Sequence, residues 1–338
     1  MTRGMKASFL VPLAWLLLAV PVSGTEAGIA EEVYVRSFDS AYLAAYLRIP
    51  PGEGPHPAIL FIHGGVGGFG MDLTRRSAYQ YVQAHLYAAG FAVFQMDYRR
   101  FDFGDVELED IVAGYRYLQS RPEISRIGVI GGSHGGYLAL LLATRVKPAA
   151  TISFAGLTDI RAMMFERVAA AVREPKPDPM WRERRHHDGR TLREETEIIE
   201  KGGQAPGLPH GRGDREIEMD LAERWGDDPE VFKLYSPVEQ THQMQGPVLY
   251  LVGSQDRDQL KAGGRRLVEQ LQQAGRQARY SEYPDMPHAF YWGIRPDPDG
   301  NLPTQFYLAL KETTDFMSRW LKDRAHPERS RTDGREQR

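Results

Sequence analysis

Short apolar runs alternate along this chain with segments in which apolar side chains recur at helical spacing. This alternation predicts βαβ crossovers and an α/β fold, with a mostly parallel central sheet and helices on both faces. The expected strands are residues 32–38, 42–49, 58–62, 91–96, 127–130, 150–154, 248–252 and 278–283. The expected helices are residues 79–89, 108–118, 137–143, 260–274 and 306–321. The first two strands flank a polar Asp39-Ser40 pair, so we expect them to form a hairpin.

Residues 161–236 interrupt this alternation. The segment is charged and rich in proline and glycine, and it shows no long helical or strand pattern. Long irregular segments inside a compact domain are usually functional loops or linkers. We therefore expect an inserted lid within a single catalytic domain, residues 25–323, followed by a polar tail at residues 324–338.

Residues 1–24 have the layout of a secretory signal peptide. A basic start with Arg3 and Lys6 precedes an apolar stretch at residues 9–22, which ends in small residues suited to cleavage. The stretch is shorter than the ~20 residues that a membrane-spanning helix needs. We expect a mature chain that begins near Thr25, has no membrane span, and is exported to the periplasm or secreted.

Composition excludes several classes of protein. The 338 residues are 42% hydrophobic and 26% charged, which is ordinary for a globular domain. There is no cysteine, so a cysteine nucleophile, a disulfide framework and a cysteine-ligated zinc site are excluded. The net charge of -3 gives no reason to expect a nucleic-acid partner. The sequence leaves the oligomeric state open.

The stretch Gly131-Gly132-Ser133-His134-Gly135 lies between an expected strand and an expected helix. This placement is typical of a nucleophile elbow, in which a serine occupies a strained turn and its neighbours two positions away must lack bulk. Gly131 and Gly135 meet that requirement. The helix that follows directs its N-terminal amides and the positive end of its dipole toward a forming oxyanion. We therefore predict that Ser133 is a nucleophile.

A nucleophilic serine needs a base, and the base needs an acid that orients it. Asp256 lies in the turn after the expected strand 248–252, and His288 lies in the loop after the last strand. Catalytic groups of open α/β sheets collect at the carboxyl ends of strands. We predict a Ser133–His288–Asp256 triad, with Asp258 as the alternative acid.

Two backbone amides are candidates for holding an oxyanion. His134 adjoins the serine, and its N–H rather than its side chain is the expected donor. His63-Gly64-Gly65 follows an expected buried strand, where a glycine pair lets the backbone approach a substrate carbonyl. We predict that Gly65 supplies the second N–H, with Val66 as the alternative.

Four other histidines are not expected to belong to the site. His186 and His187 lie in the charged insertion, where a metal site would need a third ligand that the sequence does not locate. His210 and His242 fall in loops without a strand end nearby.

Several motifs follow one another in order: His63-Gly64-Gly65, Asp97-Tyr98-Arg99, Arg126-Ile127-Gly128, Gly131-Gly132-Ser133-His134-Gly135-Gly136-Tyr137, Tyr235-Ser236-Pro237, Gly253 with Asp256, and Pro287-His288 with Phe290. With this set, the chain from about residue 32 to residue 321 resembles the catalytic domain of the prolyl oligopeptidase family of serine peptidases. The resemblance implies the α/β-hydrolase fold. It also implies a triad of Ser133, Asp256 and His288.

The chain departs from that family at several points. Val66 stands where the family often has proline, and Arg100 stands where it often has glycine. We expect no β-propeller, because the residues before Glu32 are too few to form one. Domains of this kind that lack the propeller also resemble carboxylesterases and dienelactone-hydrolase-like enzymes.

The resulting hypothesis is a serine hydrolase that cleaves a small ester or a short peptide through an acyl-enzyme, with no cofactor and no metal. A carboxylesterase or dienelactone-hydrolase-like esterase is the alternative enzyme. A binding protein that has the hydrolase fold without catalysis is the alternative from another class.

Overall fold

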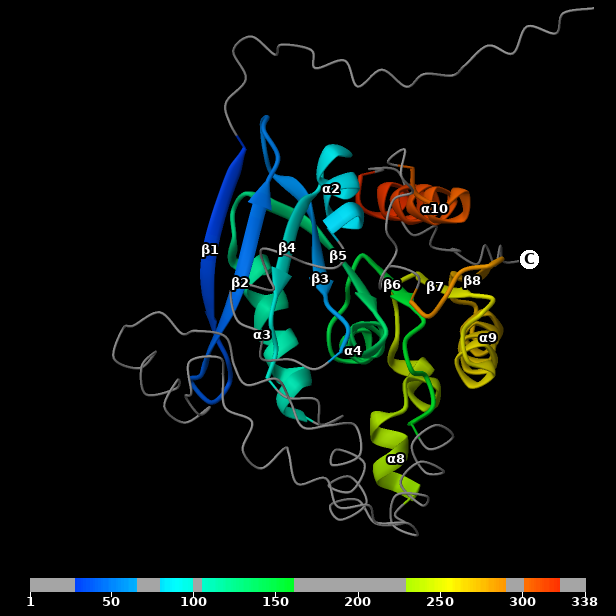
Figure 1. The fold of residues 1–338 in the computed structure, drawn as a ribbon. Coiled ribbons are helices and arrows are strands. Elements are labelled where there is room, and N and C mark those ends of the chain that lie inside the picture. The colour runs from blue at the N-terminus through cyan, green and yellow to red at the C-terminus, as the bar shows by residue number, and fades with distance from the viewer. Residues whose placement is uncertain (1–27, 66–79, 100–104, 161–228, 290–300, 323–338) are drawn as a thin grey trace, which may run out of the picture.

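The computed structural model describes residues 28–65, 80–99, 105–160, 229–289 and 301–322. These residues form an eight-stranded sheet in the order β1-β2-β4-β3-β5-β6-β7-β8 (Figure 1). The strands are β1 (Ile29–Arg36), β2 (Tyr42–Ile49), β3 (His56–Ile62), β4 (Ala92–Met96), β5 (Ile124–Gly132), β6 (Ala150–Phe154), β7 (Val248–Gly253) and β8 (Ala278–Tyr283). β2 pairs antiparallel with β1 and β4, and the other pairings are parallel. The predicted hairpin and mostly parallel sheet are confirmed.

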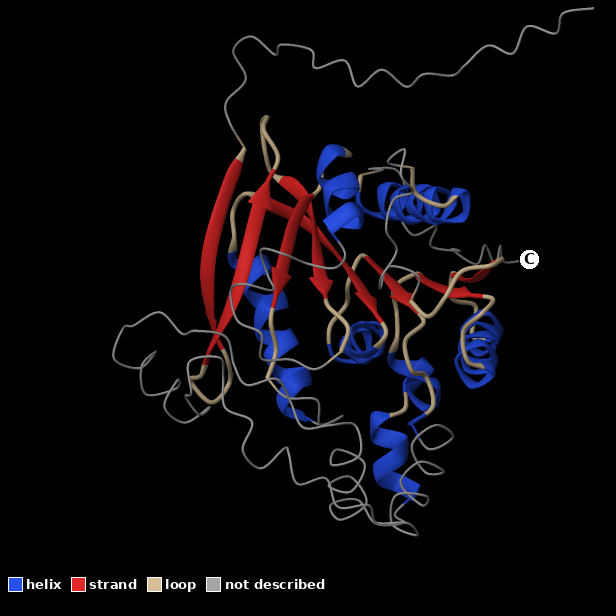
Figure 2. Ribbon diagram, in the orientation of Figure 1, coloured by secondary structure: helices blue, strands red, loops and turns tan. Residues whose placement is uncertain are grey.

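Helices cover both faces of this sheet, as predicted (Figure 2). One face carries α2 (Gln80–Ala88) and α10 (Thr304–Leu321), and the other carries α3 (Asp105–Ser120), α4 (His134–Arg145) and α9 (Asp258–Gln273). A short helix, α8 (Pro229–Tyr235), and a 3₁₀ segment, η1 (Pro237–Gln243), precede β7. None of the described helices is both long and apolar enough to cross a membrane.

The central strands have no solvent-facing side. Every residue of β4, β6 and β7 is buried. Strands that are covered on both faces need continuous apolar runs rather than alternation. This requirement explains why the sequence shows short unbroken apolar runs at these places.

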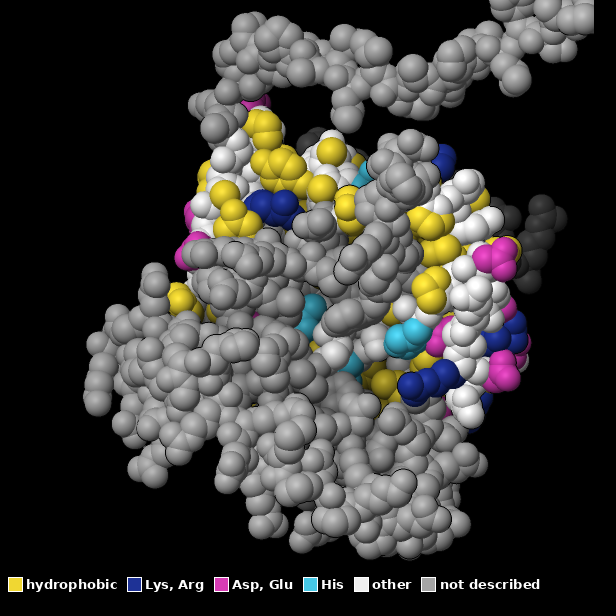
Figure 3. Space-filling view, viewed as in Figure 1, with side chains coloured by type: hydrophobic (Ala, Val, Ile, Leu, Met, Phe, Trp, Pro, Cys, Tyr) yellow, Lys and Arg dark blue, Asp and Glu magenta, His cyan; other side chains and the backbone are white. Residues whose placement is uncertain are grey.

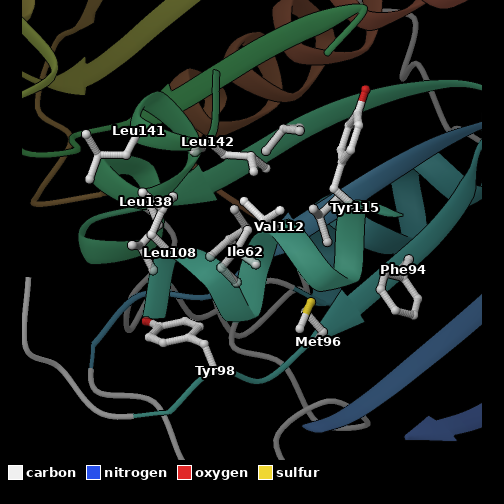
Figure 4. Packing of buried hydrophobic residues seen from close by; sticks show 14 of the residues in the cluster. Ile62, Phe94, Met96, Tyr98, Leu108, Val112, Tyr115, Leu138, Leu141 and Leu142 are labelled. Atoms are coloured by element: carbon white, nitrogen blue, oxygen red, sulfur yellow. The ribbon is translucent and has the colours of Figure 1, made fainter. Parts of the chain in front are cut away.

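Two hydrophobic layers attach the helices to the sheet. On the α3 and α4 side, Leu108, Val112 and Leu138 pack against Ile62 of β3 and Met96 of β4 (Figure 4). The opposite layer includes Val82, Leu86, Phe306 and Met317. Burial of each such side chain stabilises the fold by about 1.5–3 kcal/mol. The packing holds the carboxyl ends of the parallel strands at one edge.

The predicted lid departs from the edge of the sheet where β6 ends. Ile160 N donates to Ser236 Oγ (3.0 Å), and Val238 N donates to Thr158 O (2.9 Å). The two ends of the insertion are thus side by side. Its end forms α8, whereas residues 161–228, the predicted signal peptide (1–24) and the predicted tail (324–338) lie outside the described residues. The lid, the signal peptide and the tail stay predictions.

Candidate active site

The turn between β5 and α4 holds Ser133 in a backbone conformation that side-chain-bearing residues rarely adopt, with φ 53° and ψ -121°. A Cβ on Gly131 would lie 2.0 Å from the carbonyl oxygen of Gly135. A Cβ on Gly135 would lie 2.2 Å from the carbonyl oxygen of His63. Only glycine fits at either position, so the strand–turn–helix geometry of the predicted elbow is present.

Ser133, His288 and Asp256 form one hydrogen-bonded chain. Ser133 Oγ lies 2.8 Å from His288 Nε2, and His288 Nδ1 lies 2.8 and 2.9 Å from the two carboxyl oxygens of Asp256. A carboxylate accepts the Nδ1 proton, which leaves Nε2 free to accept the serine proton. The structure therefore brings together the three residues that the sequence singled out.

Main-chain contacts hold the acid and the base next to each other. Gln255 N donates to Met286 O (3.1 Å), and Asp285 N donates to Ser254 Oγ (2.9 Å). A Cβ on Gly253 would lie 2.1 Å from Met286 O, so glycine is needed where the two loops meet. β7 and β8 are neighbouring parallel strands, so the loops at their carboxyl ends begin side by side.

The two candidate acids have opposite surroundings. The Asp256 side chain is fully buried, and Arg257 N donates to its Oδ1 (2.8 Å). The Asp258 side chain is 95% exposed and pairs with Lys261 at 3.0 Å. Asp256 therefore reaches His288, whereas Asp258 faces solvent.

The serine and the histidine are accessible within the described part of the chain. The His288 side chain is 45% exposed, and Ser133 is half-buried. Figure 3 shows histidine side chains at the surface of this face among the described residues. A ligand can thus approach both groups from solvent among the described residues.

The predicted oxyanion donors lie on two segments that touch. His134 is the first residue of α4, and Gly65 follows β3 with φ 76°, a left-handed conformation that favours glycine. The close approach of Gly135 to His63 O joins the first turn of α4 to the end of β3. Val66, the alternative donor, lies outside the described residues.

The buried His63 side chain orients the peptide that carries the Gly65 N–H. His63 Nδ1 is hydrogen-bonded to Gly64 O (3.0 Å), and Nε2 is hydrogen-bonded to Asp97 Oδ1 (3.0 Å). The carbonyl of Gly64 and the N–H of Gly65 belong to one planar trans peptide, so a bond that fixes one group also fixes the direction of the other.

A family model described as the alpha/beta hydrolase fold matches residues 59–292 of this sequence. The chain belongs to this family. The order of the strands and the elbow after β5 agree with the match, and the α/β-hydrolase fold that the resemblance implied is confirmed.

By their names, three known proteins that this chain is similar to are one esterase and two peptidases. An uncharacterized peptidase of Bacillus subtilis is 28% identical over 151 residues, which are 40% of this chain and 56% of that relative. The solved carboxyl esterase 2 of the fungus Tuber melanosporum has a TM-score of 0.58 at 16% identity, over 87% of this chain and 88% of that chain. A puromycin-hydrolyzing peptidase of Mycobacterium tuberculosis has a TM-score of 0.57 at 18% identity, over 87% of this chain and 40% of that chain.

The two structural likenesses show the shared fold. The chain spans little more than half the length of the Bacillus subtilis relative.

The residue after the nucleophile carries a buried imidazole. His134 Nε2 is hydrogen-bonded to Glu107 Oε2 of α3 at 2.8 Å, and both side chains are almost completely buried. Burial lowers the pKa of His134 well below its usual range, and the charge of nearby His63 lowers it further. The imidazole is therefore neutral at pH 7 and helps anchor the first turn of α4.

Sequence reasoning missed the side chains that support the oxyanion segments. Asp97 and Tyr98 belong to a motif of the resemblance, but no role was predicted for them, and Glu107 precedes the expected helix 108–118 without any signal of its own. Of the histidines set aside, His242 is exposed. The other three, His186, His187 and His210, lie outside the described residues.

Proposed function

We propose that this alpha/beta hydrolase is a serine hydrolase that forms a covalent acyl-enzyme on Ser133. The observation that carries the proposal is the hydrogen-bonded chain from Ser133 Oγ through His288 to the buried Asp256. An imidazole between a serine hydroxyl on a strained turn and a buried carboxylate is the arrangement that activates a nucleophile.

The reaction follows from these contacts in two halves. His288 Nε2 takes the proton of Ser133 as its oxygen attacks the substrate carbonyl carbon, while Asp256 fixes the tautomer and stabilises the imidazolium. The imidazolium then gives that proton to the leaving alcohol or amine, and an acyl ester remains on Ser133. Water, deprotonated by His288, attacks the ester carbonyl carbon, and the imidazolium returns that proton to Ser133 Oγ as the acid is released.

The carbonyl oxygen becomes negative in both halves and needs hydrogen-bond donors. We assign this role to the backbone N–H groups of His134 and Gly65. His134 is the first residue of α4, whose N-terminus also carries the positive end of the helix dipole. Loss of one such donor costs about 10²–10³ in kcat in other enzymes.

The substrate class we propose is a short peptide or a small ester. Two of the matched proteins are named as peptidases and one as a carboxyl esterase, and both names support acyl transfer of this kind. The sequence resemblance favours the peptidase, and the carboxylesterase is the alternative. Both would use the same acyl-enzyme and would differ in the leaving group.

A first experiment tests the nucleophile. Ser133→Ala is expected to lower kcat on p-nitrophenyl acetate by about 10⁴-fold or more, because the triad then lacks its attacking oxygen. A fluorophosphonate probe should label the wild type and leave Ser133→Ala unlabelled. Ser120→Ala, a change at the exposed end of α3, is the matched control and should keep both properties.

Two outcomes would contradict the assignment. Retention of more than about 1% of kcat in Ser133→Ala would exclude Ser133 as the nucleophile. A folded wild type that neither reacts with the probe nor hydrolyses any ester would favour the non-catalytic binding protein.

A second experiment separates the two substrate classes. A panel of p-nitrophenyl esters would be compared with aminoacyl- and dipeptidyl-anilides at equal concentration. Anilide hydrolysis with kcat/KM comparable to that of the best ester supports the peptidase. Ester hydrolysis without any anilide cleavage supports the carboxylesterase, because an amine is the poorer leaving group.

We also propose that the protein is exported and that its signal peptide is removed near Thr25. The basic start and short apolar stretch of residues 1–24 support this proposal. N-terminal sequencing of protein recovered from the periplasm or the medium should begin near Thr25. Exported protein that still begins with Met1 would contradict cleavage.

A further inference from the structure

Tyr98 lies between the two backbone segments assigned to the oxyanion. It is completely buried just beyond the end of β4. Its ring stacks on His63 with centroids 4.4 Å apart and planes 15° apart, and it lies 5.9 Å from the ring of His134. The Tyr98 ring therefore packs against His63, which precedes Gly64 and Gly65, and faces His134, which follows Ser133.

The Tyr98 hydroxyl bonds the glycine segment directly. It donates to His63 O (3.0 Å) and to Gly65 O (2.8 Å), so a single proton is shared between two carbonyl oxygens. Figure 4 shows the ring at one end of the apolar cluster, beside Leu108, with its hydroxyl pointing away from Met96. The two accepting carbonyls flank Gly64, so the hydroxyl clamps this stretch from both sides.

A glycine pair does not hold one conformation by itself. Glycine populates left- and right-handed regions almost equally, and Gly65 has to stay at φ 76° for its peptide groups to keep their directions. The ring of His63 fixes the Gly64 carbonyl from one side. The hydroxyl of Tyr98 fixes the neighbouring carbonyls from the other.

We propose that Tyr98 is a positioning residue for the oxyanion site, which acts by holding the Gly65 backbone through its hydroxyl. The inference rests on the proposed serine hydrolase function. When Ser133 Oγ bonds to the substrate carbonyl carbon and its proton passes to His288, the π electron pair of the carbonyl moves to oxygen. A segment already held in place can donate to that oxygen without reorganising during the step.

Tyr98→Phe removes only the hydroxyl and leaves the ring stack intact. Because the donor is loosened rather than deleted, kcat on p-nitrophenyl acetate should fall about 10- to 100-fold, less than the loss of a whole oxyanion donor. KM should stay within about two-fold, since the ground state makes little use of the donor. An aryl trifluoromethyl ketone inhibits by forming a hemiketal with Ser133. Its Ki should rise by the same factor as kcat falls.

Tyr115→Phe is the matched control. Tyr115 is also buried, donates to a main-chain carbonyl (Lys147 O, 3.2 Å), and lies in the same cluster two helical turns beyond Leu108. A structural role alone would lower the unfolding temperature of both variants and leave kcat and Ki unchanged. Unchanged kcat and Ki in folded Tyr98→Phe would overturn the proposal.

A second measurement covers the case in which Tyr98→Phe fails to fold. 3-Fluorotyrosine at position 98 keeps the ring and the donor, and its ¹⁹F resonance should shift when the trifluoromethyl ketone adduct forms. The same label at position 115 should not shift, and equal behaviour of the two labels contradicts the inference. A wild-type protein that does not react with fluorophosphonate would contradict the proposed function itself. An active wild-type protein together with a Tyr98→Phe variant of unchanged kcat and Ki would contradict only this inference.

Discussion

Gly131 lies where the turn before α4 folds back on itself. Alanine there would bring its Cβ to 2.0 Å from Gly135 O, a backbone atom that cannot move without opening the turn. We expect Gly131→Ala to lower the free energy of unfolding by about 3 kcal/mol or more, measured by urea titration. Gly275→Ala is the control, since its φ is 72° but nothing lies within 4 Å. It should cost about 1–2 kcal/mol, the strain of a left-handed alanine alone.

His134 also makes the stability of the fold depend on pH. Burial lowers the pKa of His134 in the folded state, so below about pH 6.5 the unfolded chain takes up a proton that the folded chain does not. Stability is therefore lost as the pH falls from about 6.5 toward the folded pKa, by at most about 1.4 kcal/mol per pH unit. His134→Asn should flatten the unfolding free energy between pH 7 and pH 5. The exposed His242→Asn should keep the wild-type slope, and an unchanged slope in His134→Asn would assign the effect elsewhere.

At the scale of elements, Arg99 joins the segment after β4 to helix α3 and to the opening hairpin. It makes a 2.7 Å ion pair with the fully buried Asp110 and another of 2.7 Å with Asp39. Burial alone would lower the pKa of Arg99, but hydrogen bonds to these two carboxylates raise it above its usual range. The network links Arg99, the residue after Tyr98, to Asp110 of helix α3 and to Asp39 between β1 and β2.

Removal of one partner from this buried pair should be costly. Asp110→Ala leaves the guanidinium of Arg99 without its buried carboxylate, and we expect a loss of about 3 kcal/mol in the free energy of unfolding. Asp315→Ala is the control, because Asp315 pairs with Lys311 on the surface and both side chains are more than half exposed. That change should cost under about 1 kcal/mol. Equal losses in the two variants would show that the Arg99 network does not hold these elements together.

At the scale of the whole molecule, α10 closes the hydrophobic layer on the sheet face opposite α3 and α4. Met317 of α10 is fully buried, and its sulfur would lie 2.8 Å from a Cβ on Gly128 of β5, the strand that leads to Ser133. Met317→Ala should lower the free energy of unfolding by about 2–5 kcal/mol through the cavity that it leaves. Met317→Leu conserves volume and should cost less than about 1.5 kcal/mol. Similar losses of unfolding free energy in the two variants would indicate that the shape of the side chain, rather than its volume, determines the stability of this layer.

The sequence by itself determined the succession of strands and helices and the residues at the strand ends. Periods of apolar residues report local structure, because the side chains of a strand or helix face the core at fixed intervals. The nucleophile elbow could also be predicted from the sequence, because a strained turn between a strand and a helix requires glycine on both sides of Ser133. Asp256 and His288 could be chosen because parallel strands end at one edge of the sheet.

Only the tertiary structure decided which side chains surround that edge. It buried Asp256 and left Asp258 in solvent, although the two acidic residues are only two positions apart in the sequence. It also brought Glu107 to His134 and Tyr98 to Gly65, across 27 and 33 residues of sequence. These contacts depend on the strand order, in which β3 lies between β4 and β5, and on the packing of α3 against α4. Local periodicity carries no information on that order, because it records which face of an element is buried and not which element covers it.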